Sequence, residues 1–207
     1  MCNRYLTARD IERLKAIFSN APDDWFEGSD KKYDTVYPKS KVPVYLRVRG
    51  EDYFSNFQWG IHPTWAKTPG QILTNTKSEE VLNKPTWIEA FKRRRCLMPA
   101  TAFFEPATID GKKFQMRFEL KSGEAFSFAA IWEKTDRYGT PVNCCSLLTT
   151  EPNALVAEVH GRMPMILPQR HYDLYLNTPP EEAASLIEIL QPYPAEEMIG
   201  AFDSEST

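Results

Sequence analysis

Apolar residues alternate with polar ones along residues 113–120, where Phe114, Met116, Phe118 and Leu120 recur at every second position. This period of two predicts a half-buried β-strand. The later stretch 126–132 is nearly all apolar and predicts a central strand, and 142–150 is predicted to be another buried strand. Short turns separate the three stretches, so together they predict an antiparallel meander.

Further strands are expected at 42–48 and 53–59, on either side of a turn at 50–52, and a short strand from Cys96 to Pro99 leads toward Glu105. Helices are expected at 7–19, 87–94, 152–159, 169–176 and 180–190. In the first, Ile11, Leu14 and Phe18 recur at helical spacing. The sequence from Thr86 to Glu89 has the form of a capping box, which favours a helix start at that point.

These elements predict an α+β protein. We expect a mainly antiparallel, barrel-like β-sheet core with peripheral helices, in a single domain spanning residues 1–195. Residues 196–207 are acidic and are predicted to form a solvated tail. No repeat, low-complexity segment or linker divides the chain.

Composition narrows the function classes without naming one. The 207 residues are 42% hydrophobic and 26% charged, with a net charge of -3, which is typical of a soluble globular protein. This charge argues against a general basic coat for nucleic acid, but a local basic groove remains compatible with it. No signal peptide or apolar stretch of membrane-spanning length is evident, so we expect a cytoplasmic protein (nucleoid-associated if bacterial) that makes no membrane contact.

Four cysteines and three histidines show no metal-binding spacing. Cys144 and Cys145 lie within an apolar run and are predicted to be buried. We therefore expect neither a metal nor another cofactor, and nothing in the sequence requires more than a monomer.

Cys2 directly follows the initiator methionine. If Met1 is removed, Cys2 carries a thiol and a free α-amine on adjacent carbons, with reference pKa values of about 8.5 and about 8. Both groups are then partly reactive near neutral pH. The alternative is a frayed terminus without a function, as in most chains.

Several other positions have two interpretations. Glu105 lies among aromatic residues and a proline, where desolvation would raise its pKa and suit it to general acid catalysis; otherwise it faces the surface. His160 follows a helix end and is either structural or catalytic. Trp65 is either a core residue or a platform for a base. The basic run 92–95 is either a solvated helix end or a phosphate contact.

Four short motifs follow one another along the chain. They are Cys2 with Arg4, then Asn75, then Glu105 after two phenylalanines, then the run His160-Gly161-Arg162-Met163-Pro164. Their combination resembles the SRAP family (SOS response-associated peptidase-like proteins), which shield abasic sites in single-stranded DNA. The resemblance covers roughly residues 1–190. Supporting stretches are 42–44, 59–63, 95–99, 128–132 and 148–154.

The chain departs from the family pattern at three places. Asn3 replaces a glycine, Lys77 replaces an arginine, and Pro106 replaces a tryptophan. Lysine keeps the positive charge but lacks the planar fork that grips a phosphate with two hydrogen bonds.

The resemblance implies a partner and a chemistry. The partner would be single-stranded DNA that contains an abasic site, and the setting would be DNA repair and the SOS response to DNA damage. The Cys2 amine would condense with the C1′ aldehyde of the sugar, and the thiol would then close a five-membered thiazolidine. The product would be a covalent protein–DNA crosslink formed by a lyase-like activity.

The resemblance also implies roles for single residues. Glu105 would move protons as acid or base, His160 would relay protons or hold the ring-opened sugar, and Asn75 would orient the amine or the sugar. The candidate DNA contacts are Arg4, Trp65, Lys77, Thr149 and Arg162. Two other functions stay open: an N-terminal-cysteine (auto)peptidase that uses Cys2 with His160 as base, and a single-stranded DNA-binding module without covalent chemistry.

Overall fold

The computed structural model describes residues 2–8, 11–25, 35–68, 71–109, 111–136 and 141–203. Its centre is a closed ring of five strands in the order β8–β9–β4–β3–β6, which a further pairing between β6 and β8 completes. The predicted barrel-like core is therefore confirmed. The strands are β3 (Lys41–Val48), β4 (Glu51–Trp59), β6 (Arg95–Ile109), β8 (Phe126–Thr135) and β9 (Val142–Thr150).

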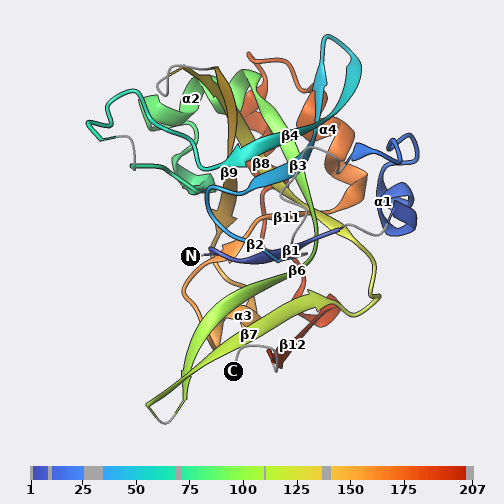
Figure 1. Ribbon diagram of the computed structural model, residues 1–207, viewed down its shortest axis with the longest axis vertical. Helices are drawn as coiled ribbons and strands as arrows, with labels where there is room; N and C mark the ends of the chain where they lie inside the picture. Colours follow the sequence, from blue (N-terminus) through green and yellow to red (C-terminus); the bar gives the residue numbers. More distant parts are fainter. Residues whose placement is uncertain are drawn as a thin grey trace.

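Strand β6 organises the molecule, and Figure 1 shows it running from the upper part of the fold to the lower hairpin. Its first half pairs with β8, from Arg95↔Ile131 to Ala100↔Phe126. Its second half pairs with β7 (Lys112–Leu120), from Phe103↔Phe118 onward. The predicted meander is thus wrong in one respect: β7 pairs with β6 and not with β8, because one long strand serves two neighbours in turn.

Most pairings in the sheet are antiparallel, as predicted, but β9 makes two parallel ones. It pairs with β4 through Gln58↔Cys144 and with β5 (Asn75–Lys77) through Asn75↔Leu147. The β3–β4 hairpin turns through Arg49 and Gly50, whose φ angles are 55° and 83°. Two successive positive φ angles are typical of the type I′ turn, whose twist matches that of paired strands.

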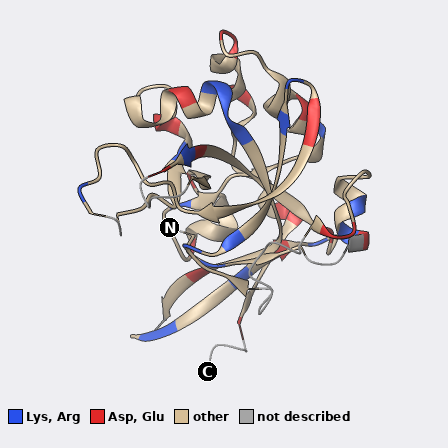
Figure 2. Ribbon diagram, turned by 45° about the horizontal axis from the view of Figure 1, so that its top comes forward, with Lys and Arg blue, Asp and Glu red and all other residues tan. Residues whose placement is uncertain are grey.

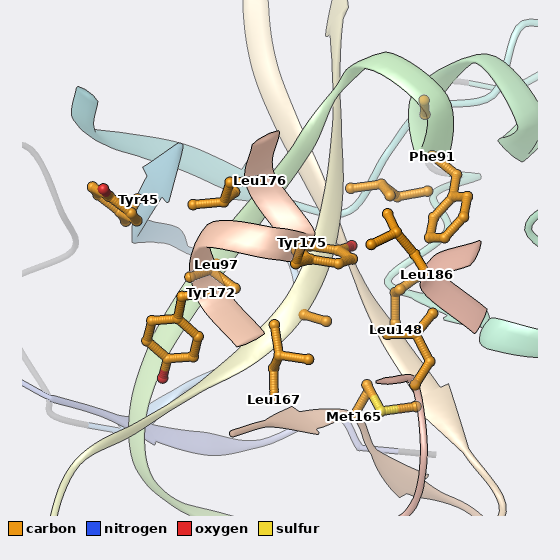
Figure 3. Close-up of a cluster of buried hydrophobic side chains, with 14 of the residues drawn as sticks. Tyr45, Phe91, Leu97, Leu148, Met165, Leu167, Tyr172, Tyr175, Leu176 and Leu186 are labelled. Atoms are coloured by element: carbon orange, nitrogen blue, oxygen red, sulfur yellow. The ribbon is translucent and has the colours of Figure 1, made fainter. Parts of the chain in front are cut away.

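Four of the barrel strands, β3, β6, β8 and β9, are largely buried on both faces, which explains their long apolar stretches, whereas β4 is largely half-buried or exposed. One set of alternate residues fills the barrel interior, among them Tyr5, Trp59, Cys96, Phe128 and Cys145. The other set packs outward against helices. Figure 3 shows this outer cluster with Tyr175 at its centre, surrounded by residues such as Phe91, Leu97, Leu148 and Leu186.

The helices are short and lie at the periphery (Figure 1). They are α1 (Ile11–Ile17), α2 (Pro85–Arg93), α3 (Ala154–Ala157) and α4 (Tyr172–Asn177), with 3₁₀ turns at Ser78–Glu80 (η2), Gln169–His171 (η3), Ala183–Ile189 (η4) and Ala195–Glu197 (η5). Helix α2 begins before the predicted capping box, since Pro85 occupies its first turn and its N-cap, Lys84, makes no side-chain cap. None of the described helices is long and apolar enough to cross a membrane.

Short strands extend the barrel sheet both near the start of the chain and in its last third. Strand β1 (Tyr5–Thr7) pairs with β6 and with β2 (Thr35–Val36). Strands β10 (Met163–Pro164) and β11 (Ile166–Leu167) pair with β9 and β8.

Part of the predicted C-terminal tail is a strand. β12 (Met198–Phe202) pairs antiparallel with β7, and Gly200 lies against the Phe118 ring, where a Cβ would come within 2.9 Å of it. Met198 is buried, whereas residues 199–202 are exposed, as a solvated tail would be. Residues 204–207 lie outside the described part.

The basic run at 92–95 does not form one charged surface. Arg95 is buried, and its guanidinium donates to the carbonyls of Phe91, Lys92, Tyr175 and Thr178. It therefore joins the C-terminal ends of α2 and α4, where helix carbonyls lack partners within the helix. The interpretation of Arg95 as a phosphate contact or a solvated helix end is wrong.

We expect Arg95→Leu to lower the free energy of unfolding by about 3 kcal/mol or more, because it leaves several buried carbonyls unsatisfied. Arg93→Leu is the matched control, since the Arg93–Glu89 pair is exposed and should cost less than about 0.5 kcal/mol. Urea unfolding monitored by tryptophan fluorescence measures both values. Equal losses in the two variants would contradict the role assigned to Arg95.

Candidate active site

Cys2 lies at the end of the barrel interior, immediately before β1. The residue is 1% exposed and packs in the interior cluster of the barrel. Its carbonyl accepts a hydrogen bond of 3.0 Å from Nδ2 of Asn75. Asn75 is the first residue of β5, whose parallel pairing with β9 fixes its position beside the terminus. Two predicted site residues are thereby brought into contact.

Glu105 approaches the same place from β6. Strand β1 pairs with β6 through Tyr5↔Phe103, and the Phe104 amide donates to the Arg4 carbonyl at 3.0 Å. Glu105 follows directly and is fully buried. Its Oε2 lies 3.8 Å from Nε2 of His160. The four predicted catalytic residues therefore gather from four separate parts of the chain.

Burial dominates the protonation of these groups. It raises the pKa of Glu105 to about 7, well above that of a solvated glutamate. Burial and the negative charge of Glu105 raise the pKa of the Cys2 thiol. Burial also lowers the pKa of His160, although its hydrogen bond to the Arg162 backbone opposes this. The site thus favours a neutral thiol, a neutral imidazole and a carboxyl group that titrates near neutrality.

Only one of the two neutral tautomers of His160 presents an N–H group toward Glu105. Its Nδ1 lies 3.0 Å from both the carbonyl and the amide nitrogen of Arg162. When Nδ1 accepts from the Arg162 amide, Nε2 carries the proton and points toward the carboxyl group of Glu105. When Nδ1 donates to the carbonyl, Nε2 presents a lone pair. The same ring can therefore give or take a proton at Glu105.

Arg162 is held by an ion pair that the sequence reasoning missed. Its guanidinium donates to both carboxylate oxygens of Glu79, at 2.7 and 2.9 Å, and to the Thr149 carbonyl at 2.7 Å. The Thr149 hydroxyl accepts from it at 3.3 Å, and Thr149 is itself buried. The fork lowers the pKa of Glu79. Glu79 lies two residues after Lys77, a predicted DNA contact, and this proximity is the one sequence signal that could have pointed to it.

Arg4 is also paired within the protein. Its guanidinium lies 2.8 Å from Asp203 and stacks over the Phe104 ring at 3.9 Å. A phosphate contact by Arg4 or Arg162 would therefore compete with a carboxylate. Both contacts stay predictions.

Lys77 and Trp65 line a shallow groove next to the site. The groove has a volume of about 290 Å³, and Asn75 is one of its lining residues. Trp65 is 53% exposed, and its indole donates to the Thr86 hydroxyl at 3.2 Å. An exposed indole beside a lysine fits the predicted role of a stacking platform. Among the described residues, no group of three or more metal-ligating side chains is found.

Comparison with known proteins identifies the family. A family model described as "SOS response associated peptidase (SRAP)" matches residues 1–201. The chain belongs to the SRAP family. The abasic site processing protein YoqW of Bacillus subtilis strain 168 is 31% identical over 202 residues, covering 96% of this chain and 90% of the relative. The abasic site processing protein YoaM of the same organism is 33% identical over 203 residues, covering 96% and 88%.

Solved structures of two further proteins share the fold. One from Bordetella bronchiseptica matches with a TM-score of 0.82 and 23% identity, over 98% of this chain and all of the other. One from Bacteroides thetaiotaomicron matches with the same score and identity, over 97% and 91%. The SRAP family model reaches into β12, so most of this strand, which we placed in the tail, lies within the matched region.

The departures from the SRAP pattern are accommodated locally. Asn3 does not adopt a positive φ angle, so this position does not need a glycine backbone. Its Oδ1 instead lies 3.4 Å from Nδ2 of Asn75. Pro106 is exposed and follows Glu105 on β6, so its side chain points to the opposite face of the strand.

The raised pKa of Glu105 predicts a stability change with pH. Between about 4.5, the ordinary value, and about 7, the unfolded chain loses this proton and the folded protein keeps it. The free energy of unfolding therefore falls as pH rises through this range, by about 3 kcal/mol in total.

Urea unfolding at pH 4.5 to 8 tests this, with Glu105→Gln expected to lack this part of the pH dependence. Glu119→Gln, which removes a surface carboxylate, is the control. A Glu105→Gln variant with the pH dependence of the unmodified protein would contradict the assignment.

Proposed function

We propose that the protein binds single-stranded DNA containing abasic sites and joins Cys2 to them in a thiazolidine crosslink, after removal of Met1. The observation that carries the proposal is the meeting of Cys2, Asn75, Glu105 and His160 at one end of the barrel. The names of the relatives, abasic site processing proteins, support the substrate.

The first step opens the sugar and forms an imine. Protonated Glu105 donates to O4′ as the C1′–O4′ bond breaks, and its carboxylate takes the proton of the C1′ hydroxyl as the aldehyde forms. The same group then passes a proton from the attacking amine to the carbonyl oxygen. The Cys2 nitrogen bonds to C1′, and one water leaves as the imine forms. Asn75, which holds the Cys2 carbonyl, fixes the direction from which the amine attacks.

The second step closes the ring. The Cys2 sulfur bonds to the imine carbon, and the thiol proton ends on the nitrogen. In this proposal Glu105 carries the proton, and its negative charge contributes to the raised pKa of the thiol. Ring closure is intramolecular, so a high effective concentration favours it even though the thiol is neutral.

The protonation states do not favour the peptidase alternative. A cysteine peptidase needs a thiolate, usually paired with a protonated histidine. Here burial raises the pKa of Cys2 and lowers that of His160, so the ion pair is disfavoured on both sides.

A denaturing gel tests the proposal. Protein whose intact mass shows the loss of Met1 is incubated with a single-stranded oligonucleotide bearing one abasic site. We expect a heat-stable shifted band, absent in Cys2→Ala and from protein that retains Met1. Cys2→Ser keeps the amine but not the thiol, so its product should be a labile imine, visible only after borohydride reduction. Absence of a band from the processed protein would sink the proposal.

The pH dependence of crosslinking tests the part of Glu105. The reaction needs a protonated carboxyl group with a pKa of about 7 and a neutral amine with a pKa of about 8. The single-turnover rate should therefore pass through a maximum between about pH 7 and about pH 8, since the two pKa values limit it on either side. In Glu105→Gln the rate should fall by about 10²-fold or more and rise steadily with pH. A maximum that persists in this variant would contradict the role.

A further inference from the structure

The outer end of the β6–β7 hairpin exposes two aromatic side chains that pack on each other. Phe114 is 39% exposed and Phe202 is 59% exposed. Their ring centroids lie 5.3 Å apart with an interplanar angle of 56°. Phe114 comes from β7 and Phe202 from β12, so the pair depends on the docking of β12. Two exposed rings form a hydrophobic surface at the far end of the hairpin.

The register places this surface on the same face of the sheet as Glu105. Glu105 pairs with Met116, and Met116 pairs on its other side with Phe202. Ala107, two residues beyond Glu105, pairs with Phe114. Side chains of directly paired antiparallel residues point to the same face. The face that bears Glu105 therefore continues outward to the two phenylalanines.

The tip of the hairpin is positively charged. Lys112 and Lys113 are exposed, and neither makes an ion pair with a described residue. By contrast, Arg117 on the same strand is neutralised by Glu119 at 2.7 Å. Figure 2 shows the blue tip projecting from the lower part of the molecule.

We propose that this end of the hairpin binds the single-stranded DNA that flanks the lesion. It comprises Phe114, Phe202 and Lys112 on the face of Glu105, and Lys113 beside them on the opposite face of β7. The inference rests on the proposed function and adds a second contact to it. Ala107 is about 7 Å from Glu105 along the strand and Ile109 about 14 Å, at about 3.4 Å per residue. A DNA strand that leaves the site along this face reaches the two rings first and Lys112 next.

The chemistry of the surface favours a nucleic acid over a protein. Aromatic rings stack on bases of any sequence, and lysines beside them attract the phosphates. An apolar protein partner, or a second copy of this chain, would have to cover two lysines at the edge of a patch of only two rings. Contacts of this kind are also independent of sequence, as an abasic lesion requires.

The experiment compares oligonucleotides that differ in the length of their flanks. The reference oligonucleotide has two nucleotides on each side of the abasic site. Two further oligonucleotides have eight nucleotides on the 5′ side or on the 3′ side and two on the other. Fluorescence anisotropy measures affinity, with the site reduced to prevent crosslinking. We expect one extension to strengthen binding about ten-fold in the unmodified protein, and this gain to be lost in Phe114→Ala/Phe202→Ala. In Lys112→Gln/Lys113→Gln the slope of log affinity against log salt should fall by about 1.4.

The controls are matched in residue type and lie elsewhere on the molecule. Tyr53→Ala removes a 45% exposed aromatic from β4, and Lys92→Gln/Lys134→Gln removes two charges. Both should keep the gain from the longer flank. The crosslinking rate at saturating oligonucleotide should be unchanged in all hairpin variants, since they leave Cys2 and Glu105 in place. Thermal melting confirms that each variant folds.

The outcomes separate this inference from the proposed function. If the unmodified protein crosslinks and the hairpin variants keep the full gain from the longer flank, the inference is wrong and the proposed function stands. If the variants lose the gain but no crosslink forms in the unmodified protein, the inference stands and the crosslinking proposal falls. If flank length has no effect on the unmodified protein, the inference is overturned.

Discussion

The pairing of β1 with β6 is the constraint on which the site depends. It places Cys2 at the end of the barrel, next to the segment that carries Glu105. The remaining contacts are arranged around this junction: Asn75 holds the Cys2 carbonyl, and His160 faces the carboxyl group. Each partner comes from a different strand or loop, so the site exists only in the complete barrel.

Enclosure in the barrel also determines the chemical character of the site. A buried carboxyl group with a pKa of about 7 is half ionised under neutral conditions and can both give and accept a proton. The same enclosure keeps the thiol neutral. An imine-forming amine followed by intramolecular ring closure tolerates a neutral thiol, whereas hydrolysis through a thiolate does not. This environment therefore favours the proposed ring closure over hydrolysis through a thiolate.

The sequence predicted the main strands of the barrel, since alternating and continuous apolar stretches leave clear local signals. Family motifs singled out four residues that the fold brings together, and their catalytic roles stay predictions. The sequence could not predict how strands share partners. The length of β6 and the parallel pairings of β9 depend on tertiary contacts, and the spacing of apolar residues along the sequence does not reveal them. Nor could it separate Arg95 from its basic neighbours, because burial of one cation among four carbonyls depends on where α4 packs. The Arg162–Glu79 pair was missed for the same reason.

Tyr5 and Phe103 pair although about 100 residues of chain separate them. Strand β1 is therefore synthesised well before its partner strand β6. Ribosomes add about 5–20 residues per second, so β1 waits about 5–20 s before its partner strand exists. Until then β1 has no partner strand to enclose Cys2, although in the folded protein Cys2 is almost completely enclosed. Removal of an initiator methionine is thus compatible with a buried terminus, because translation leaves time for it before the barrel closes.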